Sequence, residues 1–149
     1  MAIEKDIRQR NFRNLKQKSM VNLIYTYHWV VEKIKQLLFS EGITLQQYNI
    51  LRILRGSFPT PLSTLQIRDR MLDKMSDTSR IVDRLVAKGL VRKLTSKTDR
   101  RLVDVTITDE GQALLTKLDL HNDELDNIVT SLSEGEMNTL NNLLDKLRG

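Results

Sequence analysis

The chain has 149 residues, which suits one compact domain or a small domain with helical extensions that a partner buries. Apolar residues make up 40% and charged residues 29%, a globular composition, and no apolar run approaches the ~20 residues of a transmembrane helix. Cysteine is absent, which excludes disulfides and thiolate metal sites. The charged, alternating start of the chain is unlike a secretory signal, so we expect a cytoplasmic protein without a membrane partner.

The net charge of +5 is distributed unevenly along the chain. Residues 109–149 contain nine acidic and three basic residues, a balance of −6, so residues 1–108 carry +11. A basic body with an acidic C-terminal part is compatible with a nucleic-acid surface set apart from an assembly surface. Ordinary solvation explains the asymmetry equally well, so charge alone does not decide the function.

The first long helical pattern covers residues 8–40. Its apolar residues recur at helical spacing with polar residues between them: Phe12, Leu15, Leu23, Tyr27, Val30, Ile34 and Leu38. One helix of about 30 residues is too long for an ordinary globular core, so we expect it to leave the core and pack on another subunit. Gly42 is expected to end it.

Residues 44–71 predict two shorter helices. Thr44 and Gln47 have the spacing of a capping box, and Tyr48 is expected on the inward face of the helix that follows. The second helix is expected from Ser63 to about Met71, after a turn that contains two prolines.

A fourth helix is predicted between Ser76, a good N-cap, and Gly89, which stands where a left-handed C-terminal cap is needed. Its apolar stripe leaves outward or flanking positions to polar and charged residues: Asp77, Thr78, Ser79, Arg80, Asp83, Arg84 and Lys88. The groups near its start can meet base edges, and basic groups further along can meet phosphates. In isolation, an ordinary amphipathic helix with a solvated face explains the same pattern.

A β-hairpin is predicted from two runs rich in β-branched and apolar residues, 90–95 and 102–107. The polar tip between them carries Lys97, Asp99, Arg100 and Arg101. Arginine suits such a tip because a narrow minor groove has a strongly negative potential. We expect Asp99 to hold one guanidinium in a fixed direction, although an exposed ion pair without a role is the alternative.

These elements in this order predict a mainly α fold with a small β-hairpin, in the α+β class. Residues 44–108 are the expected winged helix-turn-helix core, in which a helix enters the DNA major groove while the hairpin, or wing, reaches the neighbouring backbone or minor groove. Dimerisation helices are expected on both sides of it, in residues 8–40 and 109–147.

The C-terminal region predicts two helices. Thr108 can cap a helix whose stripe extends from Leu114 to Ile128, and Ser133 and Glu136 form a capping box before a leucine-rich segment. Together with the first long helix, these faces offer more apolar surface than a core of this size needs. A twofold dimer would place two reading helices about one DNA turn, ~34 Å, apart.

These motifs together resemble the MarR family of bacterial winged-helix transcription factors. The resemblance runs from ITLQQY through SRIVDRLVAKGLV to TDRR and ITDEG. It implies a single domain over residues 1–149 that forms a homodimer, binds a roughly palindromic operator in double-stranded DNA and usually represses transcription. It also implies release of the DNA by a small aromatic or phenolic effector that binds between the dimerisation and DNA-binding regions.

Carried over residue by residue, the resemblance places Ser76 to Arg84 in the recognition helix and Asp99 to Arg101 in the wing signature. Two positions depart from the family pattern. The proline common between the first wing strand and the tip is missing, and Gln66 with Ile67 replaces the usual small residue in the preceding helix.

An enzyme is the alternative class, but the chain has two histidines and no recognisable glycine-rich phosphate loop or nucleophile arrangement. We therefore expect no catalytic residue, cofactor or metal site. His121 is expected to be packed or interfacial, whereas Tyr27 and Tyr48 are candidates for an effector pocket. A winged-helix protein-interaction module without specific DNA binding is the remaining alternative, which salt-sensitive binding to a specific duplex would exclude.

Overall fold

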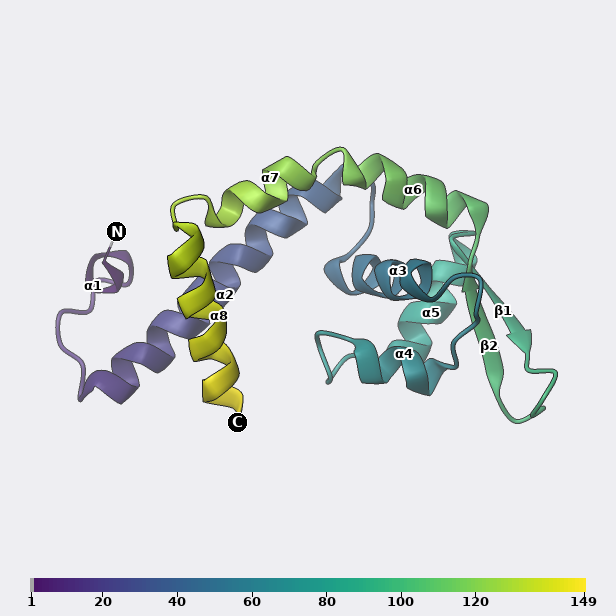
Figure 1. Cartoon of the computed structure of the whole chain (residues 1–149), viewed down its shortest axis with the longest axis horizontal. Coiled ribbons are helices and arrows are strands. Elements are labelled where there is room, and N and C mark those ends of the chain that lie inside the picture. The colour runs from purple at the N-terminus through teal and green to yellow at the C-terminus, as the bar shows by residue number, and fades with distance from the viewer. Residues whose placement is uncertain (1) are drawn as a thin grey trace.

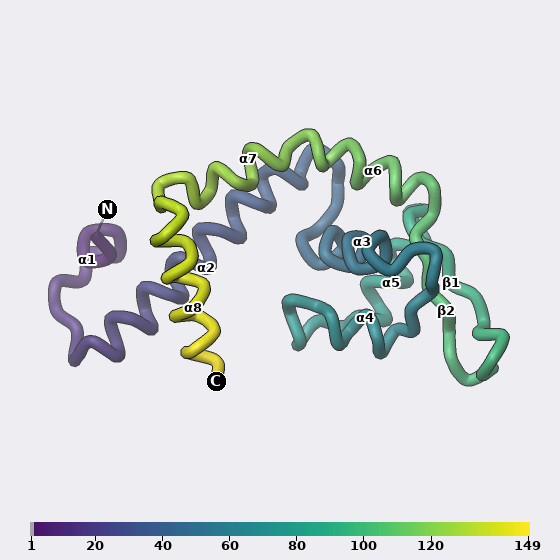
Figure 2. The backbone as a smooth tube through the Cα atoms, in the orientation of Figure 1, coloured from purple at the N-terminus to yellow at the C-terminus, as the bar shows by residue number. Residues whose placement is uncertain are grey.

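The computed structural model describes residues 2–149, which form a core lobe and a helical arm (Figure 1). The core lobe consists of α3 (Leu45–Ser57), α4 (Thr64–Arg70), α5 (Thr78–Ala87), β1 (Val91–Thr95), β2 (Val103–Ile107) and α6 (Asp109–Asp119). The arm consists of α1 (Ile3–Asp6), α2 (Leu15–Phe39), α7 (Asn122–Asp126), the 3-10 helix η1 (Asn127–Val129) and α8 (Glu134–Arg148). Both chain ends lie in the arm (Figure 2).

One hydrophobic core lies inside the lobe, where α3, α4, α5, β2 and α6 meet. Its most deeply buried side chains are Ile50, Leu51, Leu54, Ile67, Met71, Val82, Leu85, Val105 and Leu115. Full burial of one such side chain stabilises a fold by about 1.5–3 kcal/mol, so this cluster accounts for the cohesion of the lobe. The arm contributes little to it, since Leu38 near the end of α2 is the arm residue in that cluster.

The wing is an antiparallel pair in which Val91 lies opposite Ile107 and Thr95 opposite Val103. Leu62 bridges to Val105 on the other edge of β2: the Leu62 amide donates to the Val105 carbonyl at 3.0 Å, and the reverse bond measures 2.8 Å. The base of the hairpin is therefore attached to the core, while its tip extends beyond it (Figure 1). The strands predicted at 90–95 and 102–107 are confirmed to within one residue.

The predicted helix caps are largely confirmed. Thr44 and Gln47 form a complete capping box on α3, as do Ser133 and Glu136 on α8. The hydroxyl of Thr108 accepts a hydrogen bond from a backbone amide in the first turn of α6. A further capping box begins α4, where Gln66 accepts a hydrogen bond from the amide of its N-cap. That role accounts for glutamine at one of the two positions that depart from the family pattern.

The first long helix is shorter than predicted. It begins at Leu15, because Asn14 caps it by accepting a hydrogen bond from the Gln17 amide at 2.9 Å. Phe12, assigned to the helix from its spacing, lies before that cap. The short helix α1 was not predicted.

The stripe expected to continue from Leu114 to Ile128 is interrupted, and α6 ends at Asp119. His121 precedes α7 and its Nδ1 lies 2.7 Å from Glu124 Oε1, with 42% of the side chain exposed. His121 is thus partly exposed in the single chain, and its expected place in an interface stays a prediction. The acidic residues Asp123 and Glu124 lie in the first turn of α7, where negative charge favours a new helix start. Within residues 2–149, no helix combines the length and apolarity needed to cross a membrane.

Gly111→Ala is expected to destabilise the lobe, because the added Cβ would lie 2.3 Å from the Leu90 carbonyl oxygen and 2.7 Å from Ile107 Cγ1. Overpacking of this kind costs about 1–3 kcal/mol, which urea unfolding measures. Gly56→Ala is the control, since a Cβ there meets nothing within 4 Å. That change should be neutral or stabilise the helix by up to about 1 kcal/mol. Equal stabilities for the two variants would contradict the close approach of α6 to Leu90.

Candidate nucleic-acid interface

The helix α5 presents one polar face outward because its opposite side is embedded in the core. Val82 and Leu85 are buried, whereas Ser79, Arg80 and Arg84 are exposed. Val86, next to Leu85 in the sequence, is 39% exposed. The exposed face therefore carries a hydroxyl and two guanidinium groups, which are hydrogen-bonding groups suited to bases and phosphates.

The N-cap of α5 is Asp77, whose carboxylate accepts a hydrogen bond from the Arg80 amide at 3.3 Å. The prediction that Ser76 would cap the helix is therefore wrong by one residue. The Ser76 hydroxyl instead donates to the Asp73 carbonyl at 2.7 Å, and the Asp73 carboxylate accepts from the Met75 amide. These bonds hold the turn that leads into α5.

Thr78 does not lie on the outward face, so its predicted direction is wrong. It is 4% exposed, and within residues 2–149 its Oγ1 has no hydrogen-bond partner. Thr78, Val82 and Leu85 stand at helical spacing, so they share the side of α5 that faces the core. A buried side chain cannot contact a base edge without a rearrangement of the helix start.

Lys88 also differs from its prediction as a phosphate contact. Its Nζ donates to the Gly42 carbonyl at 2.6 Å and to Gln47 Oε1 at 3.1 Å. The ammonium group is therefore held at the turn between α2 and α3, at the C-terminal end of the helix side that carries Arg80 and Arg84.

A cleft of 430 Å³ separates α4 from the start of α5. Ser76 and Ser79 line one side, and Thr64 and Arg68 line the other. The sequence interpretation missed Arg68, although the spacing of Arg68 and Arg70 in the last turn of a helix beside α5 is a usable signal. A cationic group across the cleft from Ser79 extends the polar surface from α5 onto α4.

The wing tip contains the orienting contact that was predicted for Asp99. Arg101 donates from Nε to Asp99 Oδ1 and from Nη2 to Asp99 Oδ2, both at 3.1 Å. The guanidinium remains 89% exposed while the carboxylate is 33% exposed. A fixed, exposed guanidinium at the end of a narrow hairpin is suited to insertion into a groove. Lys97 and Arg100 are also exposed at this tip.

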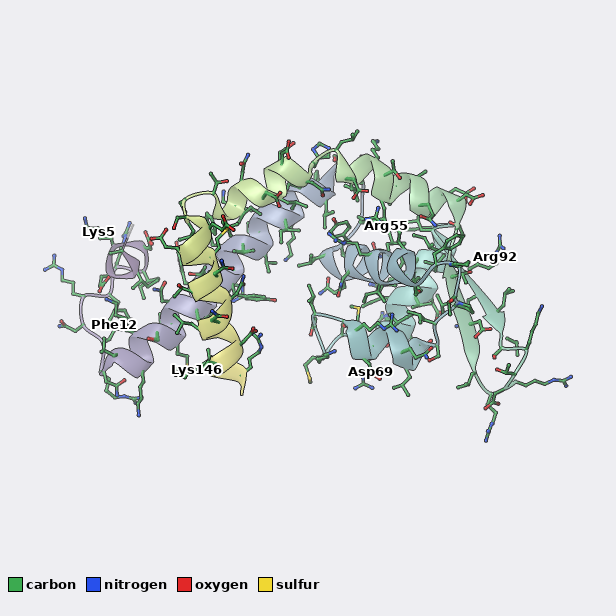
Figure 3. All side chains as sticks on the ribbon, in the orientation of Figure 1. Lys5, Phe12, Arg55, Asp69, Arg92 and Lys146 are labelled. Carbon is green, nitrogen blue, oxygen red and sulfur yellow. The ribbon has the colours of Figure 1, made fainter. Side chains whose placement is uncertain are left out.

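The wing and α5 are joined by an ion pair. Lys93 on β1 lies 2.8 Å from Asp83 Oδ1 on α5. Asp83 thus forms part of the connection between helix and wing. Arg92, the neighbour of Lys93 in the sequence, extends from the base of the hairpin on the outer side of the lobe (Figure 3).

The charge of the lobe between the start of α3 and the end of the wing supports an anionic partner. Residues 44–108 contain 13 basic and six acidic residues, a balance of +7. Among residues 2–149, no cluster of three or more histidine, aspartate and glutamate residues is arranged to hold a metal ion. The surface of residues 44–108 therefore offers positive charge to an anionic partner.

The two tyrosines expected in an effector pocket lie apart. Tyr48 lines a cavity of 330 Å³ between α2, α3 and η1, and its hydroxyl accepts from Arg52 Nη1 at 3.3 Å. Tyr27 is 59% exposed on α2, with its ring beside His28. Tyr27 does not line the cavity around Tyr48. The sequence pattern could not show this, because both tyrosines are aromatic residues on apolar helix faces.

A family model described as MarR family matches residues 41–102. The crystal structure of a MarR transcription factor from Planctomyces limnophilus is 31% identical in sequence, with a TM-score of 0.68. The match covers 91% of this chain and 98% of that one. The protein belongs to the MarR family.

Two further relatives agree with this membership. The HTH-type transcriptional regulator MhqR of Bacillus subtilis (strain 168) is 27% identical, over 87% of this chain and 89% of its own. A mutant MarR from E. coli, solved in complex with operator DNA, has a TM-score of 0.82 at 23% identity, covering 93% of this chain and 99% of that one. The winged-helix fold predicted from the sequence is thus confirmed, and MarR-family relatives are transcription regulators.

The pKa of Asp99 tests the geometry of the wing tip in this MarR-family protein. Hydrogen bonds from the Arg101 side chain, and then from its amide, hold that pKa below the ordinary carboxyl value. The contact is therefore fully present when the pH is above the ordinary carboxyl pKa, and it is lost as the pH falls through the lowered pKa of Asp99. In a carbon-13 NMR titration, Arg101→Ala should raise the pKa of Asp99, while Arg100→Ala should leave it unchanged. An unchanged pKa in Arg101→Ala would contradict the bidentate contact.

Proposed function

We propose that this MarR-family regulator is a homodimer that reads an inverted repeat in double-stranded DNA and represses transcription from it. The observation that carries the proposal is the pairing of one polar helix face with one oriented wing arginine on the same basic lobe. The exposed face of α5 has the size and chemistry to enter a major groove, and the wing extends toward the adjoining minor groove.

The contacts divide by position. Ser79 and Arg80 lie near the start of α5 and are the proposed base readers, because the N-terminal residues of a recognition helix contact base edges in the major groove. Arg84 and Lys97 are the proposed phosphate contacts. Arg100 and Arg101 are proposed to read the width and potential of the minor groove. Thr78 is left out of this set because it is buried, and Lys88 because its ammonium group bonds Gly42 and Gln47.

The proposed dimer is supported by apolar surface on the arm. Exposed large apolar side chains gather on α2 and α8: Leu15, Met20, Leu23, Ile24, Trp29, Leu140, Leu143 and Leu147. An apolar groove of 610 Å³ runs along α2 beside Ile7. Contiguous apolar surface of this kind is typical of a protein interface. We propose that the dimerisation region is the arm, and that α6 belongs to the reading lobe, where Leu115 and Leu118 are buried.

We also propose that a small aromatic effector binds the cavity around Tyr48. Val30 and Ile34 supply apolar walls, and Arg52 supplies a cation next to the Tyr48 hydroxyl. This lining suits an aromatic ring with a phenol or carboxylate substituent. The cavity lies between the arm and the lobe, so a ligand there can favour one arrangement of the two over another.

Selection from a library of duplex DNA at near-physiological salt tests the function. The proposal expects an enriched inverted repeat with half-sites about one helical turn, ~34 Å, apart, and an affinity that falls steeply with salt. Failure to enrich any sequence, with weak binding that is lost at modest salt, would contradict it. That outcome would favour a winged-helix module that binds another protein.

Arg101→Ala is expected to weaken binding to the selected operator by about tenfold or more, because each such contact contributes roughly 1–3 kcal/mol. Asp99→Asn should have a smaller effect of the same sign, since the guanidinium keeps its charge but loses its bidentate partner. Fluorescence anisotropy with labelled operator measures both. Lys16→Ala, an exposed lysine on the arm, is the control and should bind normally. Wild-type affinity for both Arg100→Ala and Arg101→Ala would remove the wing from the interface.

A further inference from the structure

We propose that Lys88 is a positioning residue that ties α5 to the end of α2 and thereby restricts the half-site spacings that the dimer accepts. The inference rests on the proposed function, because spacing has a meaning only for a dimer that reads two half-sites. It assigns to Lys88 a role inside the protein in place of a contact with DNA.

The contact joins segments that are distant in the sequence. Lys88 is the C-cap of α5, and its Nζ bonds the carbonyl of Gly42, 46 residues away, at 2.6 Å. The same ammonium bonds Gln47 Oε1, 41 residues away, at 3.1 Å. Both acceptors belong to the segment where α2 ends and α3 begins. A cation that donates to two oxygens forms charge-assisted bonds, which are stronger than bonds between neutral groups.

The oxygen that accepts from Lys88 is itself held in place. Gln47 is 5% exposed, and its Oε1 also accepts from the Thr44 amide at 3.1 Å within the capping box of α3. The start of α3 and the end of α5 therefore share one acceptor atom. A shift of the first turn of α3 moves that oxygen and changes its bond with Lys88.

The second acceptor lies in the turn that joins the arm to the lobe. Gly42 has a φ of +65°, in the left-handed region where glycine is favoured. Gly42 lies in the turn between Phe39, where α2 ends, and Leu45, where α3 begins, so the direction of its carbonyl depends on the path of the chain between the two helices. Lys88 consequently links the recognition helix to the angle at which the arm leaves the lobe.

Neighbouring ion pairs connect the α2–α3 turn and α3 to α6, and Ile43 of the same turn is buried in the core that holds Val82 and Leu85 of α5. Lys117 on α6 lies 2.9 Å from Glu41 Oε1 in the α2–α3 turn. Arg55 on α3 donates to Asp119 at the end of α6 at 2.7 Å, and this side chain lies between the two helices (Figure 3). Removal of the Lys88 ammonium thus leaves these contacts and the core packing of α5 in place. The expected loss is in orientation, not in folding.

The consequence for DNA follows from helix geometry. One inserted base pair moves two half-sites apart by about 3.4 Å and rotates them by about 35° relative to one another. A dimer whose reading helices are firmly tied to the arm loses one half-site on such an operator. A dimer whose lobes can turn relative to the arm retains part of both contacts.

The experiment measures the affinities of wild type, Lys88→Met and Lys88→Arg for the selected operator and for versions with one or two base pairs added or removed at the centre. We expect wild type to lose affinity by about 100-fold on a changed spacing, a loss of the size of one or two mismatched base pairs. Lys88→Met should lose about tenfold or less on the same series, and Lys88→Arg should restore most of the discrimination.

A salt series separates this role from a phosphate contact. Loss of a phosphate contact weakens binding equally at all spacings and reduces the slope of log affinity against log salt by about one. Lys97→Met, at the wing tip, is the comparison variant for that behaviour. Lys88→Met should keep the wild-type slope.

Each outcome decides the question. A Lys88→Met protein with the wild-type spacing profile, or with a uniform loss and a reduced salt slope, overturns the positioning role. If circular dichroism shows that Lys88→Met does not fold, Lys88→Gln, which keeps a polar side chain without the charge, is judged by the same two criteria. If wild type itself selects no operator, the proposed function fails, and this result is distinct from a failure of the Lys88 inference.

Discussion

The burial of one side of α5 is the constraint on which the rest of the structure depends. Val82 and Leu85 are anchored in the core that α3, α4 and α6 complete, and Thr78 is drawn in with them. Because this side is fixed, Ser79, Arg80 and Arg84 are directed outward. The wing is placed relative to the same helix by the burial of Val91, Val105 and Ile107 in that core, and the bond between Lys93 and Asp83 adds a contact at the surface. The proposed reading surface is therefore a consequence of core packing.

The arm has the opposite character, since its helices bury little of their own apolar surface. Leu143 and Leu147 on α8 are 59% and 69% exposed, as expected of helices that await a partner. Between arm and lobe lies a junction held by polar contacts, with Lys88 on one side and Lys117 on the other. The dimer can hold two reading surfaces joined through such junctions at a defined separation. A ligand in the Tyr48 cavity can change that separation.

Local signals in the sequence were enough to predict most of the elements of the fold. Caps such as Thr44 and Ser133, the left-handed Gly89 and the alternation of the second wing strand are decided by neighbours within a few residues. Contacts between distant segments escaped prediction. The partners of Lys88 are more than 40 residues away, and the inward direction of Thr78 depends on which side of α5 meets the core. The Asp99 contact was predictable because both partners lie in one tight loop.

The separation of the two α5 helices in the DNA-bound dimer tests the central claim most directly. The chain contains no cysteine, so Ala87→Cys, on the exposed part of α5, introduces a single site for a spin label. Pulsed electron paramagnetic resonance on the labelled protein with its selected operator should give one narrow distance of roughly 30–40 Å, about one turn of DNA. Absence of a dipolar signal, or a distance far outside that range, would contradict a twofold dimer that reads two successive major grooves.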